Sequence, residues 1–388
     1  MTPLIVPEHS WCARPAAADW SCPPPPSTPA ELHRSLPAYA ATPLTDVPGL
    51  AAEWGVRRVV VKDESARLGL PAFKALGVYY ALYRMVQDHL GGAPVAPDID
   101  SLRAAVRRIP DLELVTATDG NHGRALAHVA RTLGVPSRIF VPDVVPQGAI
   151  DAIRKERADV VVRPENYDET VALAAADARG RPGAVLVQDT AWEDYEIVPQ
   201  YIVDGYSTMF VEIDEQLGAD RAALVVTPVG VGSLAQAVIN HYKSRGRPVS
   251  VLGVEPDTAA CVLTSLRAER PVSVPTGSTV MAGLNCGTPS SLAWPYLRDG
   301  LDAVAVVTDA QSLTAARQLA DAGIPAGPCG AACVSGVRSV LADPAGRAAL
   351  GLDAGSVVVL LSTEKSRQAE HLGFRDEGDR ERRRGETG

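Results

Sequence analysis

Short runs of apolar and β-branched residues alternate along the chain with longer amphipathic or alanine-rich stretches. The runs that predict strands are RRVVVK, LELVTA, SRIFVP, DVVVR, GAVLVQ, ALVVTP, VSVLGVEP, LDAVAVVT and SVVVLLS. Helices are expected over residues 73–87 and 121–133 and in SLAQAVINHYK. This alternation predicts an α/β fold with a largely parallel sheet covered by helices on both faces. Functional residues of such folds gather at the carboxyl ends of the strands.

The two ends of the chain depart from this pattern. Residues 1–40 contain a four-proline run that cannot be helical, together with Trp11 and Trp20, which we expect to dock on a surface. Residues 374–388 are rich in charge and poor in apolar side chains, which predicts a disordered, solvated tail.

Composition narrows the possible partners. The 388 residues are 46% hydrophobic and carry a net charge of −9. The acidic balance and the 5% of aromatic residues argue against nucleic acid and against an anionic membrane surface. The beginning of the chain lacks the pattern of a signal peptide, and its apolar runs are too short to cross a bilayer. We therefore expect a cytoplasmic enzyme.

The six cysteines are too sparse for a disulfide scaffold. Cys329 and Cys333 lack the further Cys or His residues that a zinc site needs, so no metal is predicted. Cys261 and Cys286 are expected to be buried free thiols, although their pairing after folding stays open.

Lys74 lies in the segment KDESARLGLPAFKALG among apolar neighbours that include Phe73 and Leu76. A lysine in apolar surroundings has a lowered pKa and can act as an amine nucleophile that forms a Schiff base. The alternative is a lysine whose stem packs on a buried helix while its ammonium group reaches solvent. This segment alone does not decide between the two.

Two segments connect a predicted strand to a predicted helix with polar and glycine residues. TATDGNHGRALA contains Asp119 and Asn121, whose turn can face a ligand or can be an ordinary Asp-Gly turn with an Asn helix cap. TPVGVGSLAQAV contains Gly230, Val231, Gly232 and Ser233, in the arrangement that binds a phosphate through backbone amides and a helix N-terminus.

The same glycine segment also fits the dinucleotide fingerprint G-x-G-x-x-A. Glu255 follows about twenty residues later, after a strand, as that fingerprint requires. A phosphate-bearing cofactor and a nicotinamide dinucleotide are therefore both compatible with this segment.

Acidic and hydroxyl residues follow other predicted strands. Asp119 and Asp189, the latter in VQDTAWEDYE, can bind an ammonium group or act as bases, although each alone also fits a turn. Ser362 and Thr363 end the last apolar strand, where a hydroxyl can meet a heteroaromatic nitrogen.

Together these segments resemble the fold type II (tryptophan-synthase-β-like) family of pyridoxal-phosphate enzymes. That family has an early Schiff-base lysine, an Asn-containing loop at the cofactor ring, a Gly-rich phosphate loop and a strand-end hydroxyl near the pyridine nitrogen, in the order found here. A dehydrogenase would leave Lys74 and the Asn121 loop without a role. Within the family the chain is similar to the diaminopropionate ammonia-lyases, through the segments above and NYDETV, GYSTM, EIDEQL and MAGLNCGTPS.

The resemblance implies pyridoxal 5′-phosphate as the cofactor and two domains, each an open, mostly parallel sheet covered by helices. It implies a large cofactor-binding domain from residues 41–95 and 205–373, a small domain from residues 96–204, and a homodimer. The implied roles are Lys74 as the Schiff-base lysine next to Phe73, Asn121 at the ring hydroxyl, Gly230, Val231, Gly232 and Ser233 at the phosphate, Thr363 at the pyridine nitrogen, and Asp119 and Asp189 at the α-protons of the two enantiomers.

The implied reaction is α,β-elimination of 2,3-diaminopropionate to pyruvate and two molecules of ammonia. A β-ammonium group favours a carboxylate at Asp119, where relatives acting on serine or threonine usually carry a hydroxyl. Three segments depart from the expected pattern: GPCGAA at residues 327–332, Thr288, and Lys365 to Arg367. Elimination or replacement at Cβ of another small amino acid, as in a serine or threonine dehydratase, therefore remains the alternative.

Overall fold

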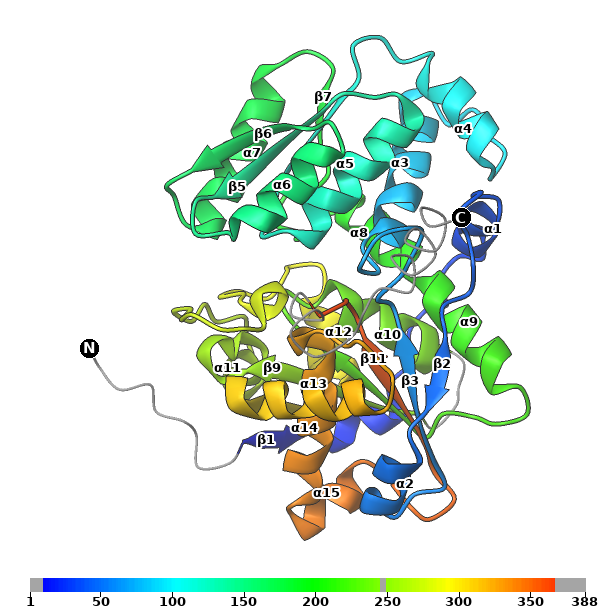
Figure 1. Ribbon diagram of the computed structural model, residues 1–388, viewed down its shortest axis with the longest axis vertical. Helices are drawn as coiled ribbons and strands as arrows, with labels where there is room; N and C mark the ends of the chain where they lie inside the picture. The colour runs from blue at the N-terminus through cyan, green and yellow to red at the C-terminus, as the bar shows by residue number, and fades with distance from the viewer. Residues whose placement is uncertain (1–9, 245–248, 367–388) are drawn as a thin grey trace, which may run out of the picture.

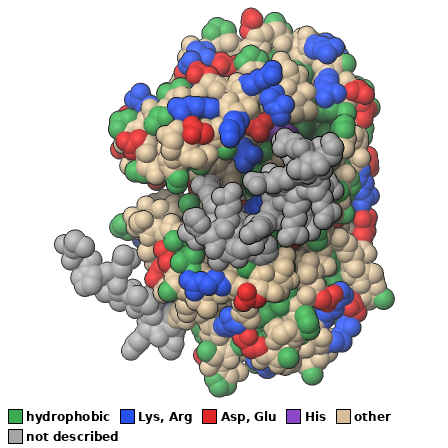
Figure 2. Space-filling view, in the orientation of Figure 1, with side chains coloured by type: hydrophobic (Ala, Val, Ile, Leu, Met, Phe, Trp, Pro, Cys, Tyr) green, Lys and Arg blue, Asp and Glu red, His purple; other side chains and the backbone are tan. Residues whose placement is uncertain are grey.

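The computed structural model describes residues 10–244 and 249–366. Two separate sheets, one of seven strands and one of four, organise these residues into the lower and upper units of Figure 1. Basic and acidic side chains are interspersed over the face of both units that Figure 2 presents. No helix among the described residues is long and apolar enough to span a membrane.

The larger sheet has the strand order β1-β10-β9-β8-β11-β3-β2. Its strands are β1 (Trp11–Ala13), β2 (Leu44–Asp46), β3 (Arg58–Asp63), β8 (Leu224–Pro228), β9 (Ser250–Pro256), β10 (Ala303–Val307) and β11 (Val357–Ser362). The five central strands are parallel, whereas β1 and β2 pair antiparallel at the edges. Val60 and Val359 face one hydrophobic cluster, and Val59 and Val358 face another on the opposite side. Burial of both faces explains the continuous apolar runs of these strands.

The smaller sheet is parallel throughout, with the order β6-β5-β4-β7. Its strands are β4 (Glu113–Ala117), β5 (Ser137–Pro142), β6 (Asp159–Arg163) and β7 (Ala184–Leu186). Leu114 and Ile139 pack in the cluster that includes α5 (Asn121–Leu133), whereas Val115 and Phe140 pack with α7 (Tyr167–Gly180). Helices therefore cover both faces of this sheet as well.

The remaining helices are α1 (Thr28–Arg34), α2 (Pro48–Trp54), α3 (Ala75–His89), α4 (Ile99–Val106), α6 (Gln147–Lys155), α8 (Ile197–Gly205), α9 (Ser207–Leu217), α10 (Ser233–Lys243), α11 (Cys261–Ala268), α12 (Trp294–Gly300), α13 (Asp309–Asp321), α14 (Pro328–Leu341) and α15 (Pro344–Ala349), with 3-10 turns at Pro15–Asp19, Asp257–Ala259 and Ala282–Leu284. Local sequence sets several helix ends. Capping boxes start α7 at Asn166 and α13 at Thr308, and Gly134 ends α5 in a left-handed conformation.

The predicted α/β fold and its strands are confirmed, with two additions. The edge strands β1 and β2 have three residues each, which is too short for a period to be visible in the sequence. In the predicted arm, Trp20 docks edge-on against Tyr296 with ring centroids 5.9 Å apart, and Trp11 packs against the core. The predicted tail at residues 374–388 lies outside the described residues.

Candidate active site

Lys74 lies between β3 and α3, and backbone hydrogen bonds hold it at the carboxyl end of β11. The amide of Phe73 donates to the carbonyl of Thr363 at 3.3 Å, and the amide of Lys365 donates to the carbonyl of Pro71 at 2.8 Å. A β-bridge joins Ala72 to Glu364 between these two bonds. The segment before Lys74 is therefore fixed to the end of the central strand rather than carried on a free loop.

The ammonium group of Lys74 makes an ion pair with Asp189 across 115 positions of sequence. Its Nζ donates to Oδ2 at 2.6 Å, with the two side chains 25% and 10% exposed, and Nζ also lies 5.2 Å from the ring centroid of Phe73. Burial disfavours both charges, but the attraction between them outweighs it, so the pKa of Lys74 lies above its ordinary value. The lowered pKa that the sequence predicted for Lys74 is therefore wrong in this arrangement, because Asp189 stabilises the ammonium form.

Asp189 owes its ionised form to the same contacts. Burial raises its pKa, but the charges beside it, of which the Lys74 ammonium group is in direct hydrogen-bond contact, outweigh that effect and hold the pKa of Asp189 below its ordinary range. Asp189 follows β7, whose neighbour in the sheet is β4, so its side chain comes from the strand end next to the Asp119 turn.

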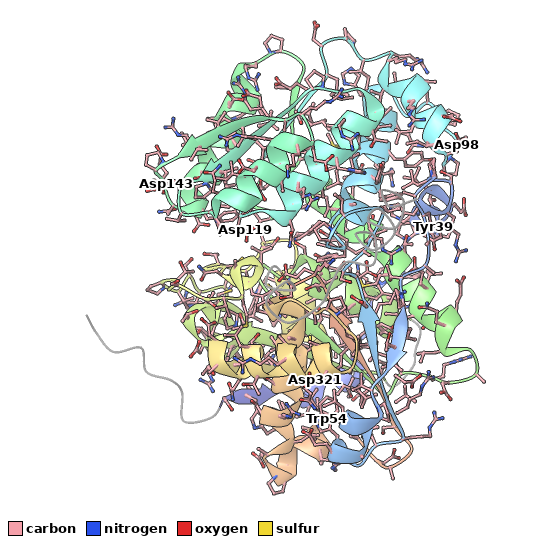
Figure 3. The ribbon with its side chains drawn as sticks, in the orientation of Figure 1. Tyr39, Trp54, Asp98, Asp119, Asp143 and Asp321 are labelled. Carbon is pink, nitrogen blue, oxygen red and sulfur yellow. The ribbon has the colours of Figure 1, made fainter. Side chains whose placement is uncertain are left out.

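The turn that carries Asp119 is built by the hydroxyl of Thr118. Its Oγ1 accepts the amides of Gly120 and Gly123, each at 2.9 Å, which starts α5 directly after the turn. A Cβ at Gly123 would lie 2.3 Å from Thr118 Cγ2, so only glycine permits this close approach. Asp119 lies at the lower edge of the upper unit, toward the lower unit (Figure 3).

Asn121, from the same turn, reaches across to the larger sheet. Its Nδ2 donates to Oε2 of Glu364 at 2.7 Å, a contact between residues 243 positions apart. The fold thus brings the Asn121 turn and Lys74 together at the end of β11. The sequence motifs predicted that Lys74 and Asn121 lie at one site.

The glycine segment connects β8 to α10 and closes the same site. Gly232 has a φ of +104°, and a Cβ there would lie 2.6 Å from Leu297 Cδ1. A Cβ at Gly230 would lie 3.0 Å from the carbonyl oxygen of Gly283. Because the first amides of α10 have no partner within the helix, this turn offers donors to an anion where no side chain intrudes.

Two serines fasten the glycine segment to the Asp189 loop. Ser233 Oγ donates to the carbonyl of Asp189 at 2.6 Å. Ser290 accepts the amide of Ala191 on its Oγ at 3.1 Å, and its own amide donates to the carbonyl of Val231 at 2.8 Å. Three hydrogen bonds therefore hold the glycine segment against the loop that carries Asp189.

Ser362 ends β11 with a buried hydroxyl that has no hydrogen-bond partner among the described residues. Its side chain is 1% exposed, and an unpaired buried hydroxyl is costly unless a ligand satisfies it. Thr363 follows β11 directly, and its carbonyl accepts from the amide of Phe73. The buried hydroxyl of Ser362 is therefore a candidate to bind a ligand at the end of β11.

Glu255, the acidic residue of the dinucleotide fingerprint, is not available to a ribose. Its carboxylate is fully buried and accepts the amides of Val262 and Leu263 at 2.7 and 2.8 Å, at the start of α11. Burial raises the pKa of Glu255 to about 7, against those two amides. The acidic residue of the dinucleotide fingerprint therefore caps the start of α11 and does not bind a ribose.

Three residues at the site were not among the predicted site residues: Glu364, His122 and Tyr206. Glu364 contacts Asn121, His122 contacts Asp189, and burial raises the pKa of Tyr206 beside Lys74. His122 lies in the motif that contains Asn121, so the motif could have indicated it. The other two become neighbours of the site only through long-range packing.

One of the three departing segments, residues 327–332, lies beside the site, whereas Arg367 of another lies outside the described residues. The segment at residues 327–332 starts α14, whose N-cap is Gly327 and whose first residue is Pro328. It lies beside Glu364, since a Cβ at Gly327 would lie 2.6 Å from Glu364 Cγ. All six cysteines are free in the structure, including Cys261 and Cys286. Within residues 10–244 and 249–366 no group of three His, Cys, Asp or Glu side chains could hold a metal ion.

Comparisons with known proteins agree with this geometry. A family model described as "Pyridoxal-phosphate dependent enzyme" matches residues 36–364. The diaminopropionate ammonia-lyase of Salmonella typhimurium is 35% identical over 360 residues, covering 86% of this chain and 87% of that protein. The Escherichia coli enzyme of the same name is 33% identical over 358 residues, covering 88% of each. A crystal structure of the Escherichia coli enzyme, in complex with an aminoacrylate-PLP azomethine reaction intermediate, superposes with a TM-score of 0.82 at 30% identity and covers 93% of this chain and 95% of that one.

Proposed function

The chain belongs to the family of pyridoxal-phosphate-dependent enzymes, and we propose that it is a lyase that converts 2,3-diaminopropionate into pyruvate and two molecules of ammonia. The observation that carries the proposal is the partly buried ion pair of Lys74 and Asp189, 2.6 Å apart, with the Asp119 turn at the neighbouring strand end. An amine with a carboxylate beside it, and a second carboxylate nearby, suits removal of a proton and an amine from adjacent carbons.

Pyridoxal phosphate is the cofactor, and three features of the site fit it. Lys74 supplies the amine that would bind its aldehyde, the glycine segment at the N-terminus of α10 suits its phosphate, and the unsatisfied hydroxyl of Ser362 suits its ring nitrogen. Asn121 would contact the ring hydroxyl. When bound, the cofactor withdraws electrons from the substrate α-carbon and so acidifies its hydrogen.

Ser362 is our choice for the ring nitrogen, in place of the Thr363 that the sequence suggested. Its hydroxyl is fully buried at the end of β11 and lacks a partner among the described residues, so a ligand there would satisfy it. A neutral hydroxyl at that nitrogen would not keep the ring protonated, which suits elimination better than transamination.

The two aspartates divide the proton chemistry. Asp119 pairs with the β-ammonium group of the substrate and can exchange a proton with it through its carboxylate. Asp189 and Asp119 each accept the α-proton of one enantiomer. Ser233 and Ser290 hold the Asp189 loop against the glycine segment, so that the Asp189 carboxylate is in position when the phosphate site is filled.

A homodimer in the cytoplasm completes the proposal. The six free thiols suit a reducing compartment. Light scattering of the purified protein measures the oligomeric state directly, and a monomer at working concentration contradicts the dimer.

The decisive experiment supplies the cofactor-loaded protein with D- and L-2,3-diaminopropionate and measures pyruvate and ammonia. We expect both products, two ammonia for each pyruvate, and neither product with Lys74→Ala. Serine, threonine and O-acetylserine with added nucleophiles form the comparison panel for elimination or replacement on another amino acid. Turnover of a panel member with none of diaminopropionate overturns the proposed substrate, and loss of cofactor absorbance in Lys74→Ala identifies Lys74 as the attachment point.

A further inference from the structure

His122 lies buried directly behind Asp189, in the first turn of α5. Its Nδ1 lies 3.7 Å from Oδ2 of Asp189, the oxygen that also accepts from Lys74, and the imidazole is 3% exposed. Its Nε2 lies 2.8 Å from the carbonyl oxygen of Val187. Asp189 Oδ2 therefore lies between Lys74 Nζ and His122 Nδ1 and is in contact with both groups.

The Val187 carbonyl determines which nitrogen of His122 carries the hydrogen. A carbonyl oxygen can only accept, so Nε2 is the donor, and in the neutral imidazole Nδ1 then presents a lone pair. Nδ1 is buried and has no hydrogen-bond partner among the described residues. At 3.7 Å it is too far from Oδ2 for a hydrogen bond, and its lone pair faces a carboxylate oxygen. One proton between these two atoms would turn this unsatisfied contact into a hydrogen bond.

The Lys74 ammonium group explains why no proton is required between Asp189 and His122 while the ion pair of Lys74 and Asp189 is present. It neutralises Asp189, so Asp189 stays a carboxylate, while burial lowers the pKa of His122 against the opposing attraction of Asp189. Lys74 and Asp189 are the charged groups that act on the imidazole.

The other titratable groups facing Asp189 do not compete for the proton. Burial raises the pKa values of Tyr167, Tyr195, Tyr206 and Cys286, so these groups stay neutral near pH 7. Asp119 adds a further negative charge near Lys74.

We propose that His122 is the proton-accepting partner of Asp189: a proton taken up at Asp189 Oδ2, when Lys74 no longer carries its ammonium charge, passes to Nδ1 of His122. The Oδ2–H bond breaks and the Nδ1–H bond forms, so Asp189 returns to a carboxylate and the imidazole becomes a cation bonded to it. No electron transfer is involved. This inference rests on the proposed function only in assigning Asp189 the α-proton of one enantiomer.

The contact between Asp189 and His122 gives a buried carboxylate a place to pass its proton within the site. Asp189 has a side chain only 10% exposed, so exchange of its proton with bulk water is restricted. A buried imidazole behind it stores the proton within the site and can return it by the same path. Because His122 contacts Asp189, loss of its imidazole is expected to affect the enantiomer that Asp189 handles more than the other.

The first test measures the protonation of His122 without turnover. Histidine side-chain ¹⁵N–¹H spectra of the cofactor-free protein are recorded from about pH 5.5 to about pH 8 for the wild type and for Lys74→Met. The His122 signals are assigned by their loss in His122→Gln, and His128→Gln, from the same helix, is the control assignment. We expect a neutral Nε2–H imidazole in the wild type, and a rise of about 1–3 in the pKa of His122 in Lys74→Met, because the carboxylate then lacks its cation. An unchanged neutral imidazole in Lys74→Met overturns the proposal.

The second test separates proton transfer from a structural role. His122→Gln retains a donor for the Val187 carbonyl but cannot accept the proton as a base. We expect its kcat to fall about 100-fold for the enantiomer that Asp189→Asn ceases to process, and to stay within about twofold for the other. His128→Gln alters contacts with Glu156 and with Arg131 of the same helix, and not with Asp189, so it should leave both rates unchanged. Equal losses for both enantiomers refute the proton path, whereas an inactive wild type contradicts the proposed function and leaves the spectroscopic test to decide on His122.

Discussion

Replacing Glu212 with glutamine removes one charge from an ionic cluster buried next to the segment that leads to Lys74. The cluster consists of Lys62, Glu64, Arg67 and Glu212, none of which is more than 1% exposed. Arg67 donates to both oxygens of Glu64 at 2.7 and 2.8 Å and to both oxygens of Glu212 at 2.7 Å. Lys62 Nζ lies 2.7 Å from Glu212 Oε2. Two cations and two carboxylates thus balance, and the substitution leaves one cation uncompensated.

The magnitude follows from two independent arguments. Burial raises the pKa of Glu212, but Arg67 and Lys62 outweigh it and lower that pKa from 4.5 to about 2. At about 1.4 kcal/mol for each pH unit, this is roughly 3 kcal/mol of stability at neutral pH. Removing one partner of a buried ion pair typically costs about 3–5 kcal/mol. For a chain of this length, such a loss lowers the melting temperature by roughly 4–6 °C.

The assay is thermal and urea unfolding of the wild type and Glu212→Gln as a function of pH. Because the folded-state pKa is lowered, the contribution of Glu212 is present above pH 4.5 and is lost as the pH falls toward 2. The difference between the two proteins should therefore be largest near neutral pH and should shrink below pH 4.5. Glu215→Gln is the matched control on α9, since Glu215 pairs with Arg34 at the surface and should contribute less than about 1 kcal/mol. A Glu212→Gln effect no larger than that of the control refutes the reasoning.

The other predictions concern the cofactor and pH. Gly232→Ala should weaken cofactor binding at least about tenfold in equilibrium dialysis, because the φ of +104° and a clash with α12 both oppose a Cβ at this position. Gly351 also has a positive φ but lies in open space, so Gly351→Ala should leave cofactor binding unchanged. Ser362→Ala should also weaken binding about tenfold without destabilising the cofactor-free protein, since its hydroxyl has no partner among the described residues, whereas a loss confined to Thr363→Val would restore the assignment made from sequence. Folding stability in urea should fall by up to about 3 kcal/mol as the pH rises from 4.5 through about 7, since the folded-state pKa of Glu255 is raised; the same slope in Glu255→Gln would exclude this carboxyl as its source.

Local sequence determined the elements of this protein and the kinds of residue at its site. The apolar runs predicted the central strands because strands buried on both faces need them, and the turn after β4 and the glycine segment after β8 were recognisable because their backbone conformations demand glycine and polar residues. The three-residue edge strands β1 and β2 left no such signal.

Tertiary structure alone decided which of these residues act on one another. The Lys74–Asp189 and Asn121–Glu364 contacts join positions 115 and 243 residues apart, so their distances depend on how two sheets pack and not on any local pattern. The same packing reversed the predicted pKa shift of Lys74: burial alone lowers the pKa of a lysine, but a carboxylate at hydrogen-bond distance stabilises the ammonium form and outweighs burial. The sequence by itself determined that a lysine, a glycine turn and two carboxylates would be present, and the folded chain determined their electrostatics, because charge interactions depend on distances that only the fold sets.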